Sequence, residues 1–149
     1  MKSLLFKFTG VFAVLAFSVS MALAKPGWTD NYEKAAATAK TEKKLMLLDF
    51  TGSDWCPWCM KLDSEVFSKP EFKDYAKANL VLIELDFPRG KTLPKHTKDQ
   101  NTKLESEYAV KGFPTVIVLD ADGKKVGQLG YMEGGPKAFI AELDKLKGK

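Results

Sequence analysis

The segment LMLLDFTGSDWCPWC, residues 45–59, joins an apolar run to a turn and a closely spaced pair of cysteines. Residues 45–50 are almost continuously apolar, a pattern typical of a strand that is buried on both faces. Residues 51–54 are the turn formers Thr-Gly-Ser-Asp. A helical pattern follows, so we expect Cys56 and Cys59 on the first turn of a helix, directly after a buried strand.

Helical and strand patterns alternate on both sides of this segment. Residues 25–31 are expected to be a short lead-in in which Asp30 caps the first helix, and residues 87–99 a polar loop that contains His96. The order predicts an α/β fold, a central mixed β-sheet with helices on both faces. The expected helices are 31–43, 55–67, 70–78, 102–109 and 136–146, and the expected strands are 45–50, 80–85, 115–119 and 125–129.

The composition excludes several classes of protein. With 149 residues, of which 45% are hydrophobic, the chain has the size of one globular domain with its own core. Two cysteines are too few for a disulfide scaffold. The formal net charge of +4 comes from lysines scattered among Thr and Glu rather than from a basic face, so no nucleic-acid partner is expected.

Residues 1–24 have the three parts of a secretory signal peptide. The segment starts with two lysines, is apolar over residues 11–17, and ends with small residues, Ala22 and Ala24, at the positions that precede a cut. An uncleaved anchor is the alternative, although the apolar stretch is short for a membrane span. Cleavage after Ala24 predicts an exported protein, periplasmic or secreted, with no stable membrane insertion once the signal is removed.

The spacing of the two cysteines suits reversible disulfide chemistry. Cys56 and Cys59 can form and release a disulfide with little backbone movement. Free N–H groups at the helix start stabilise a thiolate on Cys56, which is expected to be the attacking nucleophile, while Cys59 is the resolving thiol. Pro57 removes a donor that would have no helical partner. A passive bridge in so short a loop contributes only about 2 kcal/mol, against about 4.7 kcal/mol for a 100-residue loop.

Metal binding is the other chemistry open to two cysteines. A zinc site needs about four ligands, and His96 is the single histidine of the chain. Thiolates also suit Cu(I), for which Met60 and Met132 are candidate soft ligands. The expectation is a redox-active disulfide with no organic cofactor and no metal, and a module that binds copper or a client protein is the alternative.

The chain resembles the thioredoxin family, and the resemblance covers nearly all of residues 31–147. It implies a thioredoxin-like domain over 25–149, with Pro114 in the cis form and facing the cysteines. It also implies that the backbone of Phe113 pairs with an extended substrate segment, as in strand addition. Three motifs carry the resemblance: Leu47-Leu48-Asp49-Phe50, Trp55-Cys56-Pro57-Trp58-Cys59 and Gly112-Phe113-Pro114-Thr115.

Asp49 is similar to the buried acid of the family, which implies that it accepts the proton of Cys59. An ordinary strand-end acid is the alternative. The sequence departs from the family pattern by one extra residue between this acid and the first cysteine. It also has Leu82 near the position of the family's buried lysine, and Glu84 on the same strand is expected to face the site instead.

The resemblance also implies a substrate-binding surface around the cysteines. Trp55 is expected to shield the site, and Trp58 to form an apolar docking surface with Phe113, although packing of Trp58 onto its own loop is the alternative. The expected substrate-binding residues are Trp55, Pro57, Trp58, Phe113 and Pro114.

These expectations combine into an exported thiol–disulfide oxidoreductase that exchanges disulfides with protein substrates. A reductant is favoured, because Trp58 cannot carry charge as the histidine of the family's oxidants does, and because the chain is too short for the extra helical domain of its periplasmic oxidant. In an oxidising compartment a reductant requires an electron donor, which we expect to be a membrane thiol relay. A disulfide-donating oxidase or isomerase is the alternative direction.

Overall fold

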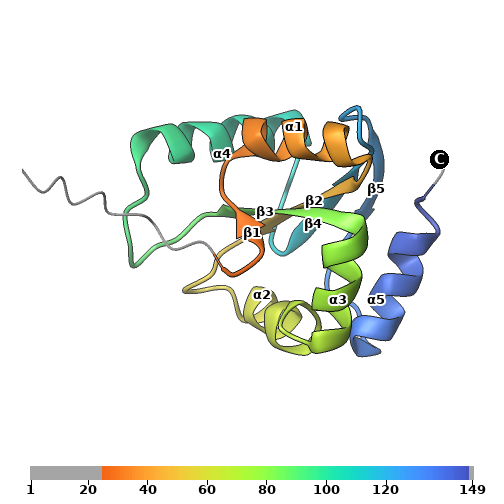
Figure 1. Cartoon of the computed structure of the whole chain (residues 1–149). Helices are drawn as coiled ribbons and strands as arrows, with labels where there is room; N and C mark the ends of the chain where they lie inside the picture. Colours follow the sequence, from red (N-terminus) through yellow and green to blue (C-terminus); the bar gives the residue numbers. More distant parts are fainter. Residues whose placement is uncertain (1–24, 148–149) are drawn as a thin grey trace, which may run out of the picture.

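Residues 25–147 are described by the computed structural model, and within them one five-stranded mixed sheet separates two layers of helices (Figure 1). The strand order is β1-β3-β2-β4-β5, in which β1 and β2 lie parallel to β3, and β4 lies antiparallel to β2 and β5. The strands are β1 (Trp28–Thr29), β2 (Leu45–Thr51), β3 (Leu80–Asp86), β4 (Thr115–Leu119) and β5 (Lys125–Leu129). The helices are α1 (Tyr32–Glu42), α2 (Pro57–Leu62), the π-helical turn η1 (Asp63–Phe67), α3 (Pro70–Asn79), α4 (Lys95–Glu107) and α5 (Gly135–Asp144).

Strand β2 is the centre of the sheet and determines which side chains face each helical layer. Asp49 of β2 is in register with Glu84 of β3 and with Val116 of β4. Side chains alternate between the two faces of a strand, so Asp49 lies on the same face as Leu47. Leu47 packs against the layer of α2, η1, α3 and α5, and Asp49 therefore faces the helix that carries the cysteines.

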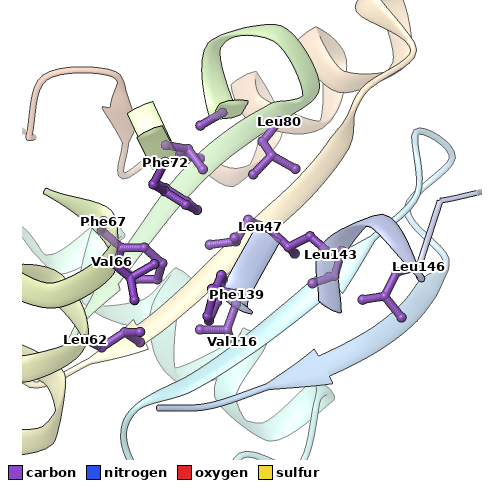
Figure 2. Close-up of a cluster of buried hydrophobic side chains, with 13 residues drawn as sticks. Leu47, Leu62, Val66, Phe67, Phe72, Leu80, Val116, Phe139, Leu143 and Leu146 are labelled. Carbon is purple, nitrogen blue, oxygen red and sulfur yellow. The ribbon is translucent and has the colours of Figure 1, made fainter. Parts of the chain in front are cut away.

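The two faces of the sheet are covered by two separate cores. Helices α1 and α4 cover one face, where Ala39 and Leu104 pack against Phe50 and Ile117 of the sheet. Helices α2, α3 and α5 cover the other face (Figure 1). Figure 2 shows this second core, in which Phe139 lies among side chains from the central strands and the surrounding helices.

The expected α/β architecture is confirmed, and three local expectations are wrong. The lead-in contains β1, which pairs with Leu82 and Ile83 but is too short to give a sequence pattern. Asn31, not Asp30, caps α1, because its side chain accepts a hydrogen bond from the backbone N–H of Lys34.

The third correction concerns the loop predicted at 87–99. Its second half is already helical, because α4 starts at Lys95 and runs to Glu107. Thr97 and Asn101, two polar residues, provide much of the buried face of this helix. A search for apolar periodicity therefore recognises only the end of the helix.

Candidate active site

The cysteine pair lies where the sequence predicts it, at the start of α2. Cys56 is the residue before the first helical residue, Pro57, and its Sγ accepts a hydrogen bond of 3.2 Å from the backbone N–H of Cys59. The two cysteines form a disulfide with a Cα–Cα distance of 5.3 Å. Their exposed fractions are only 4% and 5%, so little of either cysteine is accessible to solvent.

The turn that precedes Cys56 is built around Gly52. Its carbonyl oxygen accepts hydrogen bonds from the backbone N–H groups of Trp55 (3.2 Å) and Cys56 (2.9 Å). The indole ring of Trp55 lies so close to Gly52 that a Cβ atom at residue 52 would overlap it. The glycine therefore allows Trp55 to fold back beneath the turn.

The segment after β3 is attached to this turn. The indole N–H of Trp55 donates a 2.8 Å hydrogen bond to the carbonyl oxygen of Phe87, and the guanidinium carbon of Arg89 lies 3.7 Å from the centre of a Trp55 ring. Asp54 accepts hydrogen bonds from the backbone N–H groups of Arg89 (3.0 Å) and Gly90 (2.7 Å), and these bonds hold the pKa of its carboxyl below the usual value. One wall of the site is thus formed by residues 87–90, which sequence reasoning treated only as loop.

The segment before β4 completes this wall. The Phe113–Pro114 peptide bond is cis, as the resemblance implied. The Phe113 ring is stacked on Phe87 with 5.0 Å between ring centres, and its edge meets Trp55 at 6.0 Å. The structure therefore brings Trp55 and Phe113 together from distant parts of the chain.

Trp58 has a different aromatic partner from Trp55. Its side chain is 55% exposed and packs against Tyr131 with 5.1 Å between ring centres. The ammonium of Lys61 lies over both rings, at 5.2 Å from Trp58 and 4.9 Å from Tyr131. Trp58 thus packs on one side against Tyr131 and leaves about half of its side chain exposed. Tyr131 is partly buried and packs against the core beneath this helix.

Asp49 is buried beneath the site, and its Oδ1 has no hydrogen-bond partner among residues 25–147. Burial raises the pKa of Asp49 from 3.8 to about 7, while the positive charge of Lys25 opposes the rise. The negative charges of Glu84, Asp63 and Asp86 add to it. This pKa lies well above the ordinary value of an aspartic acid, because the buried carboxylate is poorly solvated.

The cation near Asp49 was missed by sequence reasoning. Lys25 reaches Asp63 and Glu84 from the segment before β1, at 2.8 and 3.0 Å. Glu84 faces the site as expected, whereas Leu82 is part of the apolar core. No local pattern points to Lys25, because its partners are far away in the sequence.

Within the described part of the chain, no three His, Cys, Asp or Glu side chains are grouped so that they could hold a metal ion. His96 is exposed in the first turn of α4. The same residues also include no helix of the length and apolarity needed to cross a membrane.

A disulfide at the start of a helix, after the central strand of a mixed sheet and near a cis-proline, defines a thiol–disulfide oxidoreductase of the thioredoxin fold. The chain belongs to the thioredoxin-like family, whose domain profile matches residues 32–147.

Individual relatives agree with this assignment. The chain is 35% identical to the disulfide bond reductase DsbH of Chlamydia pneumoniae over 123 residues, which are 83% of this chain and 74% of that protein. A solved structure described as DsbH oxidoreductase superposes with a TM-score of 0.77 at 32% identity, over 91% of this chain and 94% of that one. The thiol:disulfide interchange protein DsbD of Pseudoalteromonas atlantica is 26% identical over 120 residues, 78% of this chain, but this chain spans only 18% of that protein.

Proposed function

We propose that the protein is an exported reductant that transfers electrons from the Cys56–Cys59 dithiol to disulfides of protein substrates. In this proposal residues 1–24 are a signal peptide and residues 25–149 the thioredoxin-like domain, which acts in the periplasm. A membrane thiol relay returns the oxidised protein to the dithiol form, and no organic cofactor or metal takes part.

The reaction proceeds in two thiol exchanges. The Cys56 thiolate attacks one sulfur of the substrate disulfide, which forms a mixed disulfide and releases the first substrate thiolate. Cys59 then loses its proton and attacks the Cys56 sulfur, which releases the second substrate thiolate and leaves the Cys56–Cys59 disulfide. The substrate gains two electrons and two protons, and the protein loses them. The hydrogen bond from the Cys59 N–H to the Cys56 Sγ supports the first step, because it stabilises a thiolate there.

Asp49 is proposed to accept the proton of Cys59 in the second exchange. Its pKa of about 7 lets it take up a proton near neutral pH, and it lies on the sheet face that α2 covers. Its Oδ1 lacks a hydrogen-bond donor among residues 25–147, which leaves that oxygen able to bind the proton.

The substrate is proposed to bind along the rim of the disulfide. The backbone of Phe113, next to the cis-Pro114, pairs with an extended substrate strand. Trp55 and Pro57 border the sulfurs, and the exposed face of Trp58 adds apolar contact. The aromatic contact between Trp55 and Phe113 supports a binding surface that these two residues share.

The direction of electron flow is supported by the single residue Trp58 at the second position between the cysteines. An uncharged indole gives a Cys56 thiolate no ionic stabilisation, so the reduced form is not favoured as strongly as in an oxidant. The name of the 35% identical relative, disulfide bond reductase, agrees with this direction.

The reduction potential of the Cys56–Cys59 pair tests this proposal. The protein is equilibrated with dithiothreitol or glutathione buffers, and the fluorescence of Trp55 and Trp58 reports the fraction oxidised. We expect a value near about −270 mV, together with catalysis of insulin reduction that Cys56→Ser abolishes. A value near about −120 mV would show a disulfide donor and contradict the proposed direction.

A further inference from the structure

We propose that Lys25 is a positioning residue that supplies the positive charge for proton transfer to Asp49, from the N-terminal segment rather than from the sheet. The inference rests on the proposed role of Asp49 as proton acceptor. It assigns a role in thiol exchange to a residue that lies before the first strand of the domain.

The ammonium group of Lys25 connects two carboxylates from different elements. It donates a 2.8 Å hydrogen bond to Asp63 Oδ1 of η1, with which it forms an ion pair, and it lies 3.0 Å from Glu84 Oε1 of β3. The contact with Glu84 is not aligned as a hydrogen bond, so Glu84 Oε1 has no hydrogen-bond partner among the described residues. The side chain of Glu84 is only 16% exposed, and the attraction of Lys25 is therefore weakly screened by solvent.

The position of Lys25 is held by the structure around it. Its carbonyl oxygen accepts a 2.9 Å hydrogen bond from the backbone N–H of Trp28, and its ammonium lies 5.4 Å from the centre of the Trp28 ring. Trp28 in turn pairs with Leu82 in the sheet and packs on Phe67 with 5.1 Å between ring centres. The pairing of β1 with the sheet therefore holds Lys25 within reach of Asp63 and Glu84.

The same side chain borders the resolving cysteine. A cavity of about 140 Å³ is lined by Lys25 and Cys59, and its remaining walls are Thr51, Ser53, Met60 and Asp63. A cavity of this size holds water. Lys25 thus shares a cavity with Cys59, and its ammonium pairs with Glu84, which is in register with Asp49.

The charges that face Asp49 explain why this cation matters. Asp49 (β2) is surrounded by Glu84 and Asp86 (β3) and by Asp63 (η1), all of which oppose its ionisation, and Lys25 is the cation that favours it. Lys91 pairs with Asp86 at 2.9 Å and so partly balances that carboxylate. Cys56 and Cys59 carry no charge in the disulfide form. Without Lys25, a larger fraction of Asp49 would be protonated at neutral pH, and fewer molecules could accept the proton of Cys59.

Carbon-13 NMR of the Asp49 carboxyl, followed against pH in the oxidised protein, tests this directly. We expect the midpoint to rise in Lys25→Met by about one pH unit, which is about tenfold in the acid dissociation constant. Lys25→Arg keeps the charge and should stay near the wild-type midpoint. Lys40→Met removes an exposed lysine of α1 and should not move it. An unchanged midpoint in folded Lys25→Met would overturn the inference.

The rate at which Cys59 resolves a mixed disulfide separates this inference from the proposed role of Asp49. In Lys25→Met the rate at pH 7 should fall about fivefold, because the ionised fraction of Asp49 falls from about one half to about one tenth, and it should recover at higher pH, where Asp49 ionises. A merely structural loss would lower the rate at every pH and would contradict the inference. A separate variant, Asp49→Asn, tests the proposed role of Asp49. If this variant resolves mixed disulfides at the wild-type rate, that role is wrong. The effect of Lys25 on the titration of the Asp49 carboxyl, measured in proteins that keep Asp49, could still hold.

Discussion

At the scale of single residues, the site depends on one glycine and one buried acid. Gly52 leaves room for the ring of Trp55, and Trp55 in turn contacts Phe113 and the backbone of Phe87. Asp49 places an ionisable group in the interior of the sheet, where charge is unfavourable. The roles of Gly52 and Asp49 thus depend on the side chains that surround them in the folded protein, and not on the secondary-structure preference of their own segments.

Gly52→Ala is expected to displace the Trp55 ring and to lower the free energy of unfolding by about 1–3 kcal/mol, because the added methyl group overlaps a packed side chain. Urea denaturation followed by tryptophan fluorescence measures this loss. Gly112→Ala is the matched control, since a Cβ atom there has no neighbour within 4 Å. Equal stabilities for the two variants would show that the ring of Trp55 moves away without loss.

Asp49→Asn is expected to stabilise the oxidised protein in a pH-dependent way. The pKa of Asp49 is about 7 in the folded protein and 3.8 in the reference state, so the folded protein binds the proton more tightly. Stability conferred by the protonated acid is present below pH 4 and is lost as the pH rises through 7. The gain from Asn should therefore be small at pH 4 and reach up to about 4 kcal/mol at pH 8, at about 1.4 kcal/mol for each pKa unit.

Urea denaturation of wild-type and variant protein at pH 4 and pH 8 measures this gain. Asp74→Asn, which changes an exposed acid of α3, is the control and should show no such dependence. A gain of equal size at both pH values would mean that ionisation of Asp49 is not its cause.

At the scale of elements, helix α4 is attached to the sheet largely by polar contacts. Asn101 is 1% exposed and donates a 2.9 Å hydrogen bond from Nδ2 to the carbonyl oxygen of Asp86, at the end of β3. Gln100 donates to the carbonyl oxygen of Asp30 and accepts from the N–H of Tyr32, at 2.8 and 2.9 Å. These bonds connect α4 to the ends of both β3 and α1.

Asn101→Ala is expected to lower the free energy of unfolding by about 1–3 kcal/mol, because the buried carbonyl oxygen of Asp86 loses its donor. The loss should be accompanied by faster amide hydrogen exchange in α4. Lys103→Ala, at an exposed position of the same helix, should change neither quantity. If both variants are as stable as the wild type, the contact of Asn101 with Asp86 does not hold the helix.

At the scale of the whole molecule, the last helix supports the helix that carries the cysteines. Phe139 of α5 is fully buried and meets Phe67 of η1 at 5.5 Å and Phe72 of α3 at 6.1 Å between ring centres (Figure 2). Residues close to the C-terminus thus pack directly against the segment that continues α2. We therefore expect the stability of the active-site helix to depend on this layer.

Phe139→Ala is expected to destabilise the protein by about 3–5 kcal/mol, because it removes a buried ring and leaves a cavity. Since η1 continues α2, hydrogen exchange of the α2 amides should increase together with that of α5. Lys137→Ala, at an exposed position of α5, is the control. Unchanged protection in α2, beside a large loss in α5, would contradict the coupling between the two helices.

The α/β class, the four longer strands, and the position of the cysteine pair at the start of a helix after a buried strand could be predicted from the sequence alone. These features depend on local patterns: the apolar run before the turn, the spacing of Cys56 and Cys59, and the periodicity of the last helix. The cis-Pro114 was expected from the Gly-Phe-Pro-Thr motif by resemblance and is confirmed by the structure.

Strand β1, the start of α4 and the lysine beside the buried acids were decided only by the tertiary structure. Strand β1 has only two residues, which are too few to show an alternation of apolar and polar side chains. The buried face of α4 is largely polar, so it gives no apolar pattern. Lys25 meets Asp63 and Glu84 because β1 joins the edge of the sheet, a contact between distant residues that no local sequence preference encodes.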